Sequence, residues 1–117
     1  MNEPAFRRGD VVVCALAGDY GKPRPALVVQ SDLFNETHAS VVLCPISSDL
    51  TGLNLFRVAV SASEGTGLRK NSEVMVDKVT AARRERVSRR IGHLSRSEMG
   101  FVDRALRIWL ELPAAPA

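Results

Sequence analysis

The chain has 117 residues, of which 45% are hydrophobic and 25% charged, which excludes a disordered chain and fits one globular domain over residues 1–117. No segment has the apolar length of a membrane span or the pattern of a signal peptide, so we expect a cytoplasmic protein. The two His residues stand alone, which excludes a metal site built on ligand spacing, and Cys14 and Cys44 lie in apolar runs that predict buried, reduced thiols.

The positive charge is unevenly distributed. The formal net charge is +3, but eleven of the 16 Lys and Arg residues fall in residues 61–117, and 13 of the 16 are Arg. This balance is compatible with an RNA or DNA partner. The arginine run could equally form a solvated face of a protein with no such partner.

The first half of the chain predicts three strands. The apolar runs 11–16, 25–30 and 40–46 are rich in β-branched residues and have strand length. Residues 17–22 form a loop that carries one aromatic side chain, Tyr20. Between the second and third strands, residues 31–35 predict a short helical turn with Ser31 as its cap.

A basic cluster that includes Lys22 and Arg24 ends abruptly in the second strand. Pro25 fixes its own φ and pushes Arg24 toward extended geometry, so the arginine is held at the mouth of a strand. A planar, permanently charged guanidinium in that position suits phosphate binding. The alternative from the residues alone is a solubilising arginine at a strand end.

The second half predicts further strands and one long helix. Residues 55–60 and 73–79 alternate as half-buried strands, residues 80–86 predict a turn or helical turn, and residues 87–94 predict a last short strand. Ser95 and Glu98 have the spacing of a capping box, and apolar residues recur at helical spacing up to Trp109, before Pro113. We expect Trp109 to lie in the core or in a subunit interface.

Five or six strands followed by one helix, without βαβ alternation, predict a mainly β fold, a small bent antiparallel barrel with a C-terminal helix. Four segments in order resemble the MazF/PemK (Kid) family of type II toxin–antitoxin toxins. They are RGDVV at 8–12, RPALVVQ at 24–30, PISS at 45–48 and GLRKNSEVMVDKV at 67–79. The resemblance extends from Arg8 to about Leu112, which is nearly the whole chain.

The resemblance implies a CcdB/PemK-type SH3-like barrel that forms a homodimer. It implies a sequence-selective endoribonuclease that needs no metal or other cofactor and cleaves single-stranded RNA (mRNA) by attack of the ribose 2′-hydroxyl. It also implies a cognate antitoxin protein that occupies the RNA groove. Two rival functions stay open: a gyrase-poisoning toxin of the CcdB type, and a catalytically silent domain that binds RNA or antitoxin.

The family's catalytic pair corresponds to Arg24 and Ser47, where serine replaces the usual threonine and keeps the hydroxyl. In the Kid branch an Arg-x-Asp pair also contributes, and here Met75 replaces that arginine while Asp77 is retained. Lys78 replaces the glutamine that usually follows the aspartate.

The general base stays open. Asp77 is the first candidate and Asp49 the second, although an Asp that starts a loop is more often a cap. His38 and His93 titrate in the useful range, but no spacing brings either to Arg24. For RNA binding, Tyr20 is the candidate for base stacking, and Lys22 and Lys78 are the cationic candidates.

Overall fold

Seven antiparallel strands followed by one long helix make up the part of the chain that the structure, a computed structural model, describes, which is residues 6–18 and 20–113. The helices are α1 (Asp32–Asn35) and α2 (Arg96–Leu110). The strands are β1 (Asp10–Ala15), β2 (Pro23–Val28), β3 (Ser40–Ser47), β4 (Arg57–Val60), β5 (Ser72–Met75), β6 (Thr80–Arg83) and β7 (Val87–His93). The mainly β fold with a C-terminal helix is confirmed. In the loop between β1 and β2, Asp19 lies outside the described residues.

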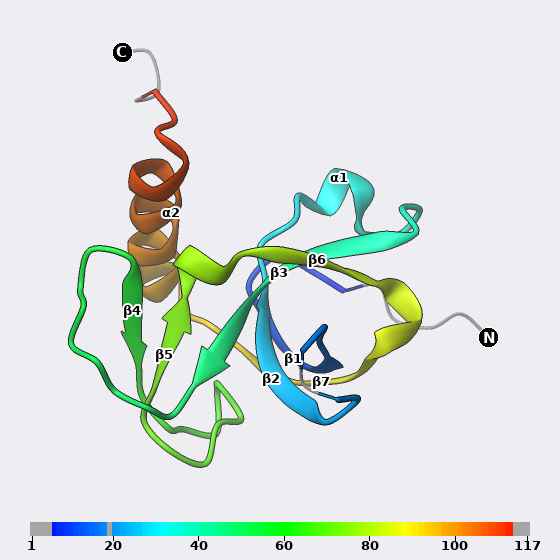
Figure 1. Cartoon of the computed structure of the whole chain (residues 1–117), viewed down its shortest axis with the longest axis horizontal. Helices are drawn as coiled ribbons and strands as arrows, with labels where there is room; N and C mark the ends of the chain where they lie inside the picture. The colour runs from blue at the N-terminus through cyan, green and yellow to red at the C-terminus, as the bar shows by residue number, and fades with distance from the viewer. Residues whose placement is uncertain (1–5, 19, 114–117) are drawn as a thin grey trace.

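The central strand is β3, because it is shared by two parts of the sheet. The strand order is β4-β5-β3-β2-β1-β7, and β6 pairs with β3 off this path. The first half of β3 pairs with β6, whereas its last two residues pair with β5. The sheet therefore curls into a small barrel, and α2 packs beside β4 and the turn after β5 (Figure 1).

Two hydrophobic clusters fill the two sides of this sheet. Val11 belongs to the cluster under α2, together with Leu27, Val74 and Val102, whereas its neighbour Val12 belongs to the cluster inside the barrel. Adjacent residues of a strand point to opposite faces, so a strand buried on both faces needs a continuous apolar run. This is the physical reason for the valine run at the start of the chain.

The structure differs from the sequence prediction around β5 and β6. Residues 80–83, predicted as a turn, form a strand, and the predicted strand 73–79 ends at Met75. Residues Val76–Lys78 form a 3-10 turn instead. This turn is required because β5 pairs with the end of β3 while β6 pairs with its beginning, so the chain must change direction between them. Local propensity carries no information about that non-local pairing.

The first family motif forms a corner between the barrel and α2. The Arg8 guanidinium makes an ion pair with Asp103 of α2 at 2.7 Å, and its Nε donates to the Val29 carbonyl at 2.8 Å. Gly9 has a φ of +96°, in the region that favours glycine, and a Cβ there would lie 3.6 Å from the Met99 side chain. These contacts tie the residues next to the start of β1 and the end of β2 to α2.

Helix α2 begins as the sequence predicts. Ser95 accepts from the Glu98 backbone N–H at 3.1 Å, and the Glu98 carboxylate accepts from the Ser95 N–H at 2.8 Å. This capping box is confirmed. Val102 and Ala105 are the buried residues of the helix, and Glu111 ends it in a left-handed conformation.

Both cysteines are buried free thiols, as predicted. Burial raises the pKa of Cys14 and raises that of Cys44 to about 12, so neither thiol ionises readily near neutral pH. Among the described residues, no helix combines the length and the apolar character needed to cross a bilayer.

Gly67 lies in the loop between β4 and β5, and we expect it to tolerate substitution least among the glycines of that loop. Its φ is +71°, and an added Cβ would lie 2.1 Å from the Ile91 carbonyl oxygen. We expect Gly67→Ala to lower the free energy of unfolding by more than about 3 kcal/mol, because backbone strain and a clash with main chain combine. Urea unfolding measures this loss. Gly21→Ala is the matched control, since Gly21 has a φ of +78° but open space around it, and we expect it to cost about 1 kcal/mol. Equal losses in the two variants would contradict the clash.

Candidate active site

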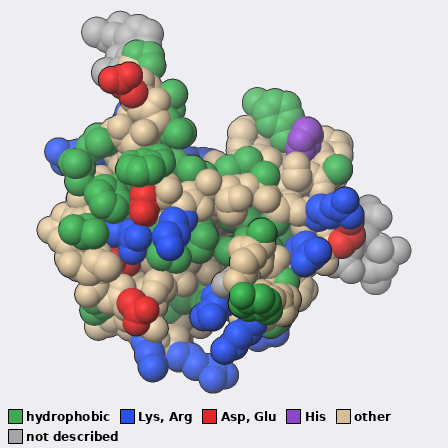
Figure 2. Space-filling model, in the orientation of Figure 1, with side chains coloured by type: hydrophobic (Ala, Val, Ile, Leu, Met, Phe, Trp, Pro, Cys, Tyr) green, Lys and Arg blue, Asp and Glu red, His purple; other side chains and the backbone are tan. Residues whose placement is uncertain are grey.

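A broad groove of about 1530 Å³ runs from the β1–β2 hairpin past the end of β3 and along β6 and β7. Among the described residues that line it, Asp49 is the single acidic one. Eight Lys and Arg residues line it as well, namely Arg24, Arg57, Arg69, Lys70, Lys78, Arg83, Arg86 and Arg89. Lys and Arg side chains gather along the lower edge of the molecule in Figure 2. The groove therefore suits a polyanion.

Arg24 and Ser47 both line this groove. Arg24 is an exposed residue near the start of β2, and Ser47 is the last residue of β3. The β2–β3 pairing ends with Ala26 opposite Pro45, and Arg24 and Ser47 each lie two residues beyond that pair. Both residues line the groove, so the structure brings together the two that the motifs singled out.

The Ser47 hydroxyl is already engaged on one side. Its Oγ accepts a hydrogen bond from the Asp49 backbone N–H at 3.0 Å. A hydroxyl that accepts in this way keeps its own proton for donation to another group. The arrangement leaves Ser47 able to donate to an oxygen bound in the groove beside Arg24.

Arg57 is the functional candidate that sequence reasoning missed. Its Nε and Nη2 donate to the two carboxylate oxygens of Asp77 at 2.7 and 3.1 Å, and the two side chains are only 12% and 16% exposed. Arg57 stands directly opposite Met75 in the β4–β5 pairing. A guanidinium from β4 therefore lies beside Asp77, although the position two residues before Asp77 holds methionine.

Asp77 lies behind Arg57. Arg57 is among the lining residues of the groove, whereas Asp77 is not among the described residues that line it. The hydrogen bonds from Arg57 hold the pKa of Asp77 below its usual value, against the opposing effect of burial. A carboxylate with both oxygens occupied and a lowered pKa is a weak proton acceptor, so its geometry fits an anchor for Arg57 better than a general base.

We expect Asp77→Asn to lower the free energy of unfolding by about 3 kcal/mol at neutral pH, because it leaves a largely buried guanidinium without its counter-charge. Since the folded pKa of Asp77 is depressed, its contribution is present above the unfolded pKa and is lost as pH falls through the folded one. The difference between wild type and variant should therefore shrink on acidification below about pH 4. Urea unfolding across this pH range measures it. A difference that stays constant with pH would contradict the assignment.

The three predicted RNA-binding residues are placed differently. Lys78 lines the groove on the 3-10 turn after β5. Tyr20 and Lys22 are exposed in the β1–β2 loop and are not among the described lining residues. The Tyr20 side chain is fully exposed, and its φ of +53° lies in the left-handed region, which is uncommon for tyrosine. The loop that carries Tyr20 joins the strand of Arg24.

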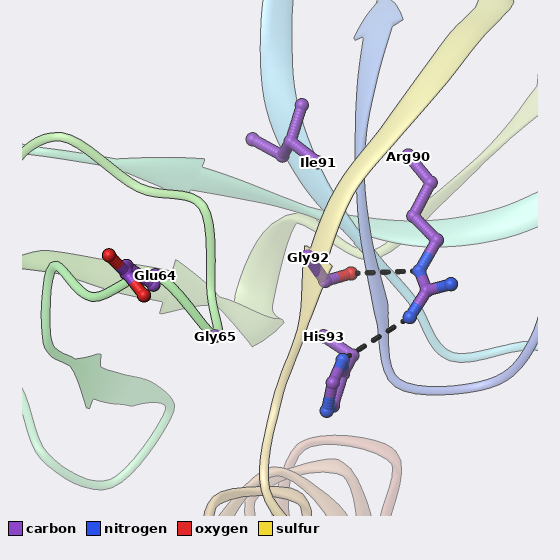
Figure 3. A pocket seen from close by; sticks show the side chains of 6 residues that line it. All are labelled: Glu64, Gly65, Arg90, Ile91, Gly92 and His93. Carbon is purple, nitrogen blue, oxygen red and sulfur yellow. Dashed lines mark hydrogen bonds between the residues drawn. The ribbon is translucent and has the colours of Figure 1, made fainter.

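Neither histidine lies in the groove. His38 is exposed in the turn before β3, and His93 lines a separate hollow of about 330 Å³. In that hollow Arg90 Nη2 lies 3.3 Å from His93 Nδ1, and Arg90 Nε donates to the Gly92 carbonyl at 3.4 Å (Figure 3). Arg90 also makes an ion pair with Asp10 at 3.3 Å. These groups satisfy one another at the junction of β7 and α2.

An apolar face covers the C-terminal end of α2 and the neighbouring β3–β4 loop (Figure 2). Trp109 is 46% exposed, and its ring centroid lies 5.6 Å from that of Phe56, at the end of this loop. The prediction that Trp109 lies in the core is therefore wrong, and a subunit interface stays a prediction. The other exposed large apolar residues of these two segments are Leu50, Leu53, Leu55, Ile108, Leu110 and Leu112.

Solved structures share this fold. The Mycobacterium tuberculosis toxin MazF-mt6 gives a TM-score of 0.78 at 24% sequence identity and covers 90% of this chain and 99% of that chain. An endoribonuclease in complex with its cognate antitoxin, from a mycobacterial species, gives a TM-score of 0.79 at 23% identity and covers 95% and 100%. A bent β barrel with a C-terminal helix is thus the fold of a class of bacterial toxins.

Sequence relatives identify the family. Residues 7–110 match the model of the PemK-like, MazF-like toxin of type II toxin–antitoxin systems. The probable endoribonuclease MazF of Mycolicibacterium smegmatis is 41% identical over 106 residues, covering 90% of this chain and 96% of that protein. The endoribonuclease MazF9 of Mycobacterium tuberculosis is 29% identical over 116 residues, covering 92% and 98%. The chain belongs to the PemK-like, MazF-like toxin family, as its four motifs predict.

Proposed function

We propose that this chain is a single-domain endoribonuclease toxin, spanning residues 1–117, that cleaves single-stranded mRNA at selected sequences without a metal or other cofactor. The observation that carries the proposal is the convergence of Arg24 and Ser47 in one cationic groove. Relatives that are named endoribonucleases support it. They do not favour a gyrase-poisoning toxin or a silent binding domain, neither of which would use Arg24 together with Ser47.

The proposed reaction is an internal transesterification. The ribose 2′-oxygen attacks the adjacent phosphorus and loses its proton, the bond to the 5′-oxygen breaks, and that oxygen takes up a proton. The products are a 2′,3′-cyclic phosphate and a 5′-hydroxyl. Charge develops on the non-bridging phosphate oxygens, where the Arg24 guanidinium and the Ser47 hydroxyl are proposed to donate hydrogen bonds.

The remaining polar groups have supporting roles in this proposal. Arg24 is a poor base because its guanidinium stays protonated. We assign proton removal from the 2′-hydroxyl to Asp49, the described acid that lines the groove next to Ser47. Asp77 supports the site indirectly. It makes the ion pair that holds Arg57, whose charge faces the same groove.

RNA binding and inhibition are proposed to use the same surface. Lys78 and the other cations of the groove bind phosphates, while Tyr20 and Lys22 on the hairpin loop contact a flanking nucleotide. A cognate antitoxin with an acidic, partly disordered segment would fill the groove and block cleavage. A cytoplasmic location follows from the substrate and agrees with the two free thiols.

The cleavage assay tests the proposed function. Purified protein is incubated with a long single-stranded RNA, with and without EDTA, and the ends of the products are mapped. We expect cleavage at recurring sequences, unaffected by EDTA, with 5′-hydroxyl ends. Loss of activity in EDTA that returns with added metal would contradict the metal-free mechanism, and an intact RNA would contradict the nuclease.

We propose that the apolar face around Trp109 joins two copies of the chain. Large side chains that stay half exposed on a small domain mark an interaction surface. We expect a homodimer at micromolar concentration, and we expect Trp109→Glu to convert it to a monomer, because dimerisation would bury the new charge. Light scattering measures the mass. Arg104→Glu, on an exposed part of the same helix, is the control, and a monomeric wild type would contradict the proposal.

A further inference from the structure

The β3–β4 loop is held down by one buried carboxylate. Glu73, in β5, is only 5% exposed and stands opposite Ser47 of β3. Its Oε2 accepts from the backbone N–H groups of Thr51 and Gly52 at 3.0 and 2.9 Å, and its Oε1 accepts from Thr51 Oγ1 at 2.8 Å. The carboxylate is therefore bonded to the loop through both oxygens.

Apolar burial contributes little to holding residues 48–55. All eight residues from 48 to 55 are exposed, including three leucines, and Phe56 is the first residue of the segment to be partly buried. A loop that buries no side chain gains little from the hydrophobic effect. Among the contacts of the described residues, the hydrogen bonds to Glu73 are those that tie Thr51 and Gly52 of this loop to β5.

The surroundings of Glu73 keep its carboxylate ionised. We call Glu73, with its hydrogen bonds to Thr51 and Gly52, the clamp. Burial opposes its ionisation, but the hydrogen bonds from Gly52 and Thr51 and the positive charge of Arg57 outweigh burial and lower the pKa of Glu73. A carboxylate that accepts several backbone N–H bonds makes strong, charge-assisted hydrogen bonds. The clamp is therefore closed at neutral pH.

The clamped loop also contains the group that orients Ser47. Asp49 lies two residues before Thr51 along the loop, and its N–H donates to Ser47 Oγ at 3.0 Å. That N–H can keep its position only while the loop keeps its path. We propose that Glu73 is a positioning residue for cleavage, which by holding Thr51 and Gly52 keeps the Ser47 hydroxyl aimed at the scissile phosphate. The proposal rests on the proposed catalytic role of Ser47.

A double-mutant cycle tests it. Glu73→Gln keeps the shape of the side chain but removes the charge and gives one oxygen position an N–H₂ donor. With single-stranded RNA containing the site mapped for the wild type, we expect it to lower kcat about tenfold with little change in KM. In a Ser47→Ala background the same substitution should change kcat less than about twofold, because residues that act through one another are non-additive.

The control is Glu36→Gln, which removes an exposed glutamate outside the groove and should leave kcat unchanged in both backgrounds. Thr51→Val weakens the same contact with Glu73 from the side of the loop. It removes the 2.8 Å bond from an exposed loop position and should reproduce part of the loss without affecting the core. An equal fall in kcat for Glu73→Gln with serine or alanine at position 47 would overturn the proposal, as would no fall at all.

Amide hydrogen exchange measures whether Glu73 holds the loop, and it does so independently of RNA cleavage. We expect the Thr51 and Gly52 amides of Glu73→Gln to exchange at least about tenfold faster than in the wild type, while the amides of β1 and β2 keep their protection. Unchanged exchange at these two amides would overturn the clamp. If the wild-type protein cuts no RNA, the proposed function fails, and the exchange result still decides whether Glu73 holds the loop.

Discussion

Replacing Arg24 with alanine should lower the rate of RNA cleavage by at least about 10²–10³-fold, because the variant loses a charged donor to the developing oxyanion. The protein should stay folded, since Arg24 is an exposed residue near the start of β2 and belongs to neither hydrophobic cluster. The loss should appear mainly in kcat, because the guanidinium is proposed to act on the transition state more than on bound RNA.

Single-turnover cleavage with excess enzyme measures this loss, and thermal unfolding checks the fold. The matched control is Arg104→Ala, which removes an exposed arginine from α2, outside the groove, and should cleave like the wild type. If Arg24→Ala kept more than about a tenth of the wild-type rate, Arg24 would be a binding residue and the proposed mechanism would lose its main electrostatic component.

A 2′-deoxy sugar at the attacked position should stop cleavage altogether, because it removes the nucleophile from the substrate. Binding should change only a few fold, since the phosphates that the groove contacts are unaltered. Anisotropy titration gives the affinity and a gel assay gives the rate, with a 2′-deoxy sugar placed several nucleotides away as the control. Cleavage of the first substrate at a normal rate would show that water or another group attacks the phosphorus.

The Arg24–Ser47 pair could be predicted from the sequence because two family motifs, at residues 24–30 and 45–48, contain these residues. Pro25 and Pro45 lie near two strand ends, and the motifs around them give Arg24 and Ser47 an approximate place in a small barrel. The structure then places both residues along one groove, just beyond the last residue pair of β2 and β3. The chemistry of this pair could thus be proposed before any coordinates, although the register itself could not.

Arg57 and Glu73 could not be found in that way, because their partners are distant in the sequence. The Arg57–Asp77 ion pair spans 20 residues, and the Glu73–Thr51 bond spans 22. In the sequence Arg57 looks like the polar position of an alternating strand, and Glu73 looks like a solvated carboxylate. Only the pairing of β4 and β3 with β5 turns them into buried, charged contacts.

In the exposed β3–β4 loop, most residues can be substituted with little effect on the stability of the fold. Eight consecutive positions, 48–55, bury no side chain, so most substitutions there should leave stability within about 0.5 kcal/mol of the wild type. Three of these positions, Ser48, Asp49 and Thr51, nevertheless line the groove beside Ser47. A lineage could therefore alter which RNA sequences are cut through changes at Ser48, which lines the groove, while Thr51 and Glu73 hold the loop in place. A library randomised at position 48 is the corresponding route to nucleases with new sequence preferences.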